Sequence, residues 1–275
     1  MTFDINAIAS AAAATTDMTV AQTGGGDYTP PAEGPCRLRF VGYVETGSHL
    51  NKGFQGAPDK VKPEAKLYFE VSGPKHKPVT TQDGKTVPCA VVEITLAVSL
   101  NEKAGFKKLF DRLNYKGTAR HMAQLLGDPY LGTLVHRPYT GKDGKPRVAL
   151  NLKDDSGFTI RPPRRQDEND EWVPVPVDPA ISPIRCFIWN SEVGLKQQWD
   201  SLFIDGEYPA KTNEAGEEIA PAKSKNYLQA RCLAALNFKG SKLDQLLGSG
   251  GKGLDLPEVQ AAAPVADESD PYAGI

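Results

Sequence analysis

Residues 37–46 read RLRFVGYVET, and this stretch decides the fold class. It follows a Gly- and Pro-rich segment, and its large side chains alternate between two faces: Leu38, Phe40 and Gly42 on one, Val41 and Tyr43 on the other. Alternating β-branched and aromatic residues predict a β-strand. The stretches KLYFEVS at 66–72 and CAVVEITLAV at 89–98 predict two further strands.

A helix is predicted after the third strand. Ser99 and Glu102 have the spacing of a capping box, which marks a helix start. Apolar side chains then recur at helical intervals, at Phe106, Leu109, Phe110 and Leu113. A second, short helix is predicted over 118–126, ended by Gly127.

Two more strands follow, over 131–136 and 147–153, with Asp143-Gly144 between them as a hairpin signal. The predicted order is therefore three strands, a helix and two strands. This is the element order of an OB-fold, a five-stranded and partly open barrel, although other β-rich folds share it. We expect an α+β, mainly β protein with an OB-like or related antiparallel barrel core.

The rest of the chain changes character. After residue 158 it is rich in proline and reads as an extended strap. Added strands are predicted at 185–189 and 201–204, and helices at 225–237 and 241–247. The predicted organisation is a flexible arm (1–34), a basic nucleic-acid-binding core (35–160), a strap with added strands and a helix (161–247), and a flexible acidic tail (248–275).

Charge is distributed unevenly along the chain. The net charge is only −2, but residues 36–165 hold 23 Lys and Arg against 12 Asp and Glu. Residues 1–35 hold four acidic residues and no Lys or Arg, and residues 166–275 hold 18 acidic residues against 9 basic ones. A basic block between acidic flanks is typical of a protein that binds a polyanion locally and stays soluble.

The sequence has no pattern that predicts catalysis. It contains no phosphate-binding loop, dinucleotide fingerprint, zinc-protease motif or nucleophile elbow. Its four cysteines are far apart and form no CxxC pair, which argues against a zinc site and a disulfide framework. Asp154 and Asp155 are better explained by a turn after a strand than by a metal site. We expect a cytosolic, non-enzymatic protein with no cofactor and no membrane segment.

Lysine and arginine interleaved with aromatic residues give the positive signal. A single-strand binder needs cations along the phosphates and exposed rings on which bases stack. The predicted phosphate contacts lie in three loop regions, at Lys52, Lys60, Lys62, Lys75, Lys77, Arg137, Lys142, Lys145 and Arg147. The predicted stacking residues are Phe54 and Tyr139, with Tyr43 and Tyr68 as candidates on the sheet face. The competing interpretation is a solvated charged surface over core aromatics.

Two further segments are open to interpretation. The run RPPRR at 161–165 either clamps phosphates or neutralises the acidic run at 167–171. The tail either is a plain disordered end or docks on partner proteins and competes with DNA for the basic face. Its candidate partner-binding residues are Asp267, Glu268, Asp270, Tyr272 and Ile275.

Several stretches carry a resemblance to a known family. They are GYVETGSH (42–49), KLYFEVSGPKHK (66–77), ARHMAQLLGDPY (119–130), DDSGFTIRPP (154–163) and QQWDSLFIDGEY (197–208). Together they resemble single-stranded-DNA-binding proteins of short-tailed lytic phages, some of which act as RNA polymerase cofactors. The resemblance implies preference for single strands and contact with phage replication proteins or RNA polymerase in an infected host cell.

The rival interpretation is a protein-interaction scaffold that works through the strap and tail. A homo-oligomer is compatible with both interpretations.

Overall fold

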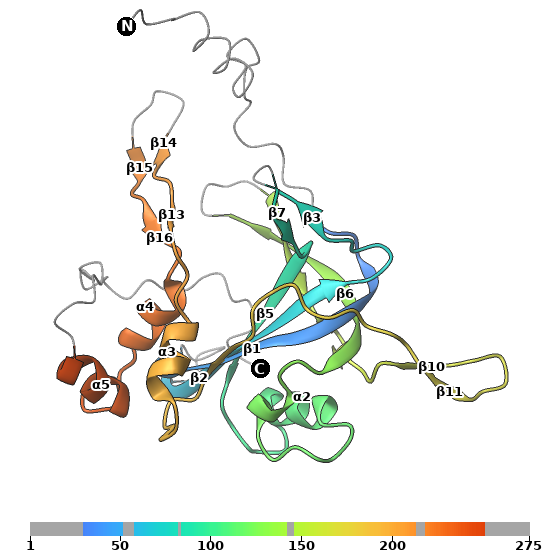
Figure 1. The fold of residues 1–275 in the computed structure, drawn as a ribbon, viewed down its shortest axis with the longest axis horizontal. Helices are drawn as coiled ribbons and strands as arrows, with labels where there is room; N and C mark the ends of the chain where they lie inside the picture. The colour runs from blue at the N-terminus through green and yellow to red at the C-terminus, as the bar shows by residue number, and fades with distance from the viewer. Residues whose placement is uncertain (1–29, 52–57, 82–83, 142–145, 213–217, 251–275) are drawn as a thin grey trace, which may run out of the picture. The chain divides into compact units, whose positions relative to one another are not determined.

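The computed structural model describes residues 30–51, 58–81, 84–141, 146–212 and 218–250 (Figure 1). The described residues from Pro31 onward belong to one compact unit, in which strands predominate over helices. The predicted α+β, mainly β class is therefore confirmed. The predicted boundary near residue 160 falls inside this unit.

Six strands form the main sheet: β1 (Gly34–Asn51), β2 (Lys60–Ser72), β5 (Ala90–Ala97), β6 (Pro129–Thr140), β7 (Pro146–Asn151) and β12 (Arg185–Phe187). Five of them follow the order β5-β2-β1-β6-β7, with antiparallel neighbours, and β12 pairs in parallel with residues 42–44 of β1. In the described part of the chain, no hydrogen-bonded pairing joins β5 to β7, so the expected barrel is not closed there.

The long strand β1 contains two irregularities, between Phe40 and Gly42 and between Glu45 and Gly47. A β-bulge adds a residue to one strand and shifts the side chains beyond it to the opposite face. Tyr43 therefore joins Leu38 and Phe40 in one buried cluster, whereas Val41 lies in another. The simple alternation predicted across this stretch is wrong beyond Phe40.

Helix α2 (Gly105–Leu113) follows β5 as predicted, but without the predicted capping box. Its N-cap is Ala104, because Ser99 and Asn101 accept hydrogen bonds from backbone amides in a preceding turn. Of the second predicted helix, only the 3₁₀ turn η2 (Met122–Leu125) forms. The side chains of His121 and Gln124 provide its capping box.

The remaining described elements are short. The further strands are β3 (Val79–Thr80), β4 (Thr86–Val87), β8 (Lys153–Asp154), β9 (Gly157–Phe158), β10 (Arg164–Gln166), β11 (Trp172–Pro174), β13 (Glu207–Tyr208), β14 (Lys211–Thr212), β15 (Glu218–Ala220) and β16 (Lys223–Ser224). The further helices are α3 (Leu195–Ser201), α4 (Tyr227–Leu233) and α5 (Lys242–Gly250). The strand predicted at 201–204 is wrong, because α3 ends there. None of the described helices has the length and apolar character needed to cross a bilayer.

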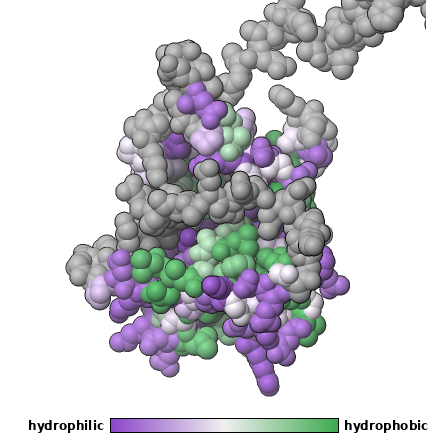
Figure 2. All heavy atoms as spheres, turned by 90° about the vertical axis from the view of Figure 1, so that its left-hand side faces the viewer, coloured by the Kyte–Doolittle hydropathy of each residue, from purple (hydrophilic) through white to green (hydrophobic). Residues whose placement is uncertain are grey.

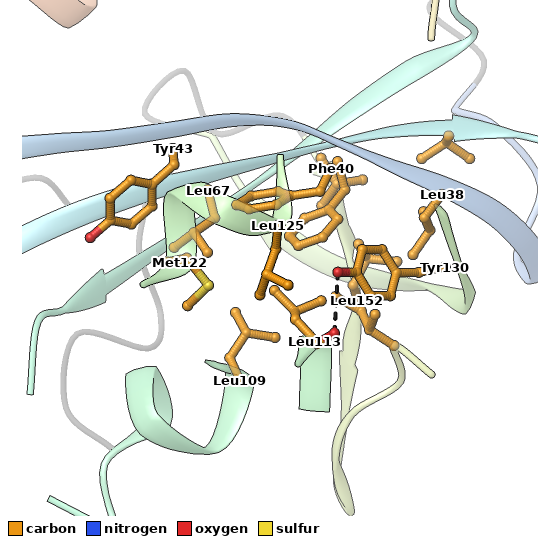
Figure 3. Close-up of a cluster of buried hydrophobic side chains, with 14 of the residues drawn as sticks. Leu38, Phe40, Tyr43, Leu67, Leu109, Leu113, Met122, Leu125, Tyr130 and Leu152 are labelled. Carbon is orange, nitrogen blue, oxygen red and sulfur yellow. Dashed lines mark hydrogen bonds between the residues drawn. The ribbon is translucent and has the colours of Figure 1, made fainter. Parts of the chain in front are cut away.

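The first hydrophobic cluster covers one face of the sheet (Figure 3). It joins β1, β2 and β6 to α2 and η2, through Leu38, Phe40, Leu67, Leu109, Leu113, Met122, Leu125 and Tyr130 among others. The Tyr130 hydroxyl donates a hydrogen bond to the backbone carbonyl of Leu113 at 3.2 Å. The helical spacing of apolar residues in α2 therefore serves to cover this face.

The second hydrophobic cluster covers the opposite face, with β12, α3, α4 and α5 packed against Val41, Val44 and Tyr68 of the sheet. The buried side chain of Glu64 in β2 accepts two hydrogen bonds from Arg231 of α4, at 3.1 and 2.7 Å. Burial raises the pKa of Glu64, but these hydrogen bonds and the Arg231 charge outweigh it and hold that pKa below its usual value. Glu64 is therefore ionised, and its hydrogen bonds with Arg231 connect the sheet to α4.

Of the proline-rich region predicted as a strap, residues 175–184 cross the sheet on the same face as the second cluster, and this segment is called the strap from here on. The carboxylate of Glu70, 3% exposed, accepts hydrogen bonds from the amides of Ile181, at 2.9 Å, and Ser182, at 2.6 Å. The Arg39 guanidinium donates to the backbone carbonyls of Val177 and Asp178. Two side chains of neighbouring strands thus hold the strap against the sheet.

Candidate nucleic-acid interface

The β6–β7 hairpin brings together three of the predicted contact residues. Tyr139 lies directly opposite Arg147, and Arg137 is two residues away on the same strand. Because opposed residues, and residues two apart, lie on the same face of a sheet, these side chains share one face. Tyr139 is 43% exposed. Arg137 donates to the carbonyl of Lys153 at 3.4 Å and lies 3.7 Å from the carboxylate of Asp155.

Lys60 and Lys62 lie elsewhere. They are exposed and pair with Asn51 and His49, at the end of the β1–β2 hairpin. Lys75 and Lys77 are also exposed, but they follow the other end of β2. The ten residue-to-residue steps from Lys62 to Ser72 span about 33 Å at the usual strand rise. The structure therefore does not gather these four lysines into one cluster.

An arginine that is not among the predicted contact residues, Arg37, lies beside Lys77. Arg37 and Lys77 line one hollow of about 280 Å³, beside Pro74 and Asp178. Arg37 also pairs with Leu131 of β6. Leu131 in turn bridges to Arg161, so the two arginines lie on the same face. Alternation along β6 puts Arg137 and Tyr139 on this face as well.

The two predicted sheet-face tyrosines are not available for base stacking. Tyr43 is 1% exposed and Tyr68 is 9% exposed. The Tyr68 hydroxyl donates to Glu93 at 2.7 Å, and burial raises the pKa of both tyrosines. Tyr43 lies in the first cluster because the register of β1 is shifted, and the C-terminal elements cover Tyr68.

An exposed tryptophan was missed. Trp172 is 57% exposed on the β10–β11 hairpin, with the guanidinium carbon of Arg164 4.6 Å from its ring centroid. Asp167 closes the connecting turn by accepting hydrogen bonds from the amides of Asn169 and Glu171. The turn residues at 167–170 were the available signal, because they predict a hairpin that places the ring in solvent. The acidic run beside Arg164 and Arg165 still leaves both interpretations of 161–165 open.

The Asp154–Asp155 pair forms a turn. Asp154 accepts hydrogen bonds from the amide and hydroxyl of Ser156, at 2.9 and 2.6 Å, which lowers the pKa of Asp154. Within the described ranges, no cluster of three His, Cys, Asp or Glu residues is arranged to hold a metal ion.

Several predicted residues lie outside the described residues. They are Lys52, Phe54, Lys142 and Lys145 in the two binding loops, and Asp267, Glu268, Asp270, Tyr272 and Ile275 in the tail. Comparison of the chain with family models, with curated proteins and with solved structures finds no match.

Proposed function

We propose that this protein binds single-stranded DNA without enzymatic activity and largely independently of sequence. The observation that supports this best is the half-exposed ring of Tyr139, which shares one sheet face with Arg137 and Arg147. A ring beside guanidinium groups offers stacking to an unpaired base and charge to its phosphates. The basic excess of residues 36–165 extends that attraction along the chain.

The sheet order also supports the proposal. The chain forms a β1–β2–β5 meander, then α2, and then a β6–β7 hairpin on the other side of β1. This arrangement is expected of an open, OB-like sheet. We infer that the β1–β2 and β6–β7 connections border the bound strand. Because the sequence resembles phage single-strand binders, we propose that the protein supports phage replication or transcription.

Protein interaction is the second candidate function. Val193, Phe203 and Leu236 are 81%, 55% and 63% exposed. Figure 2 shows hydrophobic side chains gathered on the face where the C-terminal helices lie. An exposed apolar patch is typical of a protein-binding surface. The strap is a weaker candidate for such a partner site, because Glu70 and Arg39 already occupy its backbone groups.

Replacing Tyr139 tests the proposal. Tyr139→Leu should weaken binding to a fluorescent oligo(dT) by about 1–3 kcal/mol, because one stacking platform is removed. Tyr139→Phe keeps the ring and should bind as the wild type does. Replacing Arg137 and Arg147 by Gln should reduce the slope of log affinity against log salt by about 0.7 for each phosphate that is no longer neutralised.

The comparison uses single-stranded and double-stranded DNA of equal length across a salt series. If wild-type protein binds neither with a salt-dependent affinity, the proposed function is wrong and protein interaction becomes the leading candidate. If Tyr139→Leu and Tyr139→Phe lose equal affinity, the ring is not a stacking platform.

A further inference from the structure

A cavity of about 340 Å³ lies between the sheet and the C-terminal elements. Its sheet wall is formed by Val41, Tyr68 and Val91, and its other walls by the strap, Ile204 and α4. A volume of this size, mainly apolar walls and a few polar groups are typical of sites for small organic groups.

Three polar side chains that line the cavity are connected by hydrogen bonds. The Tyr227 hydroxyl donates to that of Tyr68 at 3.2 Å, and Tyr68 donates to the carboxylate of Glu93 at 2.7 Å. Lys66 forms an ion pair with Glu93 and balances its charge. Burial raises the pKa of both tyrosines, so both hydroxyls keep their protons at neutral pH.

Arg185 is the residue left unsatisfied. It lines the cavity, and its Nε is buried with no hydrogen-bond partner among the described residues. The Arg185 guanidinium is positively charged at every ordinary pH and carries five N–H donors. The cavity therefore suits a ligand that carries an acceptor oxygen into it.

The rim of the cavity favours a nucleic-acid strand as the source of that ligand. Val91 and the ring of Tyr227 are both 41% exposed. Tyr208 of β13 pairs with Lys223 of β16, four residues before Tyr227. The ammonium of Lys225 lies 5.7 Å from the ring centroid of Tyr208. A second cation beside a second ring thus lies near the cavity mouth, as a base with its phosphate requires.

We propose that this cavity is a subsite for one base of the bound single strand, a step that rests on the proposed function. The base lies against Tyr227 and the apolar wall, and the Arg185 guanidinium donates an N–H to a carbonyl oxygen of that base. Thymine, cytosine and guanine carry such an oxygen and adenine does not. The subsite therefore favours oligo(dT) over oligo(dA).

The test uses the full-length chain and fluorescent oligonucleotides. Arg185→Met and Tyr227→Leu should each bind oligo(dT) roughly 5- to 150-fold more weakly, the range expected when one base is no longer held. Neither should lose comparable affinity for an abasic strand of equal length. Arg185→Met should affect oligo(dA) much less than oligo(dT), and Tyr227→Phe, which keeps the ring, should retain affinity.

Arg120→Met, which removes an exposed positive charge, is the matched control and should affect dT and abasic strands equally. Thermal unfolding of each variant verifies that the fold is retained. If the wild type binds oligo(dT) in a salt-dependent manner but Arg185→Met and Tyr227→Leu bind it equally well, the subsite is wrong and the proposed function stands. If the wild type binds no oligonucleotide, the proposed function itself fails.

The alternative occupant of the cavity is the acidic tail of this chain, and a synthetic peptide of residues 267–275 tests it. The proposal expects no Arg185-dependent binding of this peptide to the full-length chain. Binding that disappears in Arg185→Met, with oligo(dT) affinity unchanged, would overturn the base subsite and assign the cavity to the tail.

Discussion

Gly47 lies where strand β1 packs against the second hydrophobic cluster. Its φ of +87° favours glycine, and a Cβ there would lie 2.5 Å from Ala235 Cβ and 2.7 Å from the Trp189 ring. Backbone strain and a clash with the second cluster both oppose a side chain. Gly47→Ala should lower the free energy of unfolding by roughly 2–4 kcal/mol, measured by urea denaturation.

Gly84 provides the matched control. It also has a positive φ, +77°, but a Cβ there would meet nothing within 4 Å. Gly84→Ala should therefore show backbone strain alone, about 1–2 kcal/mol. Equal losses for the two variants would contradict the packing argument at Gly47.

At the scale of elements, the strap depends on Glu70. Glu70→Ala removes the acceptor for the amides of Ile181 and Ser182 and leaves them next to a buried sheet face. The free energy of unfolding should fall by about 2–4 kcal/mol, because hydrogen bonds to a buried charge are the stronger kind. Cleavage within residues 175–184 by a nonspecific protease should become faster than in the wild type.

The control for this variant is Glu102→Ala, which removes an exposed carboxylate in the turn before α2. It should leave both stability and the cleavage rate near the wild-type values. A strap that stays resistant to protease in Glu70→Ala would show that the Arg39 contacts alone hold it.

At the scale of the whole molecule, the two hydrophobic clusters share the strands β1 and β2. Leu109 of α2 and Leu228 of α4 are both buried, one in each cluster. Leu109→Ala and Leu228→Ala should each lower the free energy of unfolding by about 2–5 kcal/mol within a single transition.

Circular dichroism monitors this unfolding in two wavelength ranges. Far-ultraviolet signals follow the sheet, and near-ultraviolet signals follow Trp189 and Trp199 in the second cluster. The two signals should change together in both variants. Early loss of the tryptophan signal in Leu228→Ala would show instead that the C-terminal elements fold as a separate unit.

Local patterns were sufficient for most elements of the main sheet. The strands β1, β2, β5, β6, β7 and β12 and the helices α2, α4 and α5 appear where apolar spacing and turn residues predicted them. The pattern did not predict the irregularity after Phe40, because a bulge forms in response to the partner strand. The prediction that Tyr43 shares a face with Val41 was wrong for this reason. Tyr43 is not exposed, because hydrophobic clusters cover both faces.

The candidate site was predicted less well. Sequence alone indicated Arg137, Tyr139 and Arg147 as parts of one basic loop region. The structure instead places Arg137 and Tyr139 in β6, where pairing with β7 brings Tyr139 opposite Arg147. The sequence did not indicate Arg185, since its surroundings come from contacts with distant parts of the chain. Trp172 was missed although its neighbour Arg164 lies in the same hairpin. Basic residues that are near in sequence, such as Lys62 and Lys75, lie at opposite ends of one strand.

The sequence by itself determined the mainly β class, the order of the principal strands and the basic character of the middle of the chain. These properties depend on side chains within a few residues of one another. Only the tertiary structure decided which elements cover each sheet face. That choice rests on pairs such as Glu70 with Ile181 and Glu64 with Arg231, which lie more than 100 residues apart. Burial of these carboxylates requires both partners in place, and no local pattern records such a pairing.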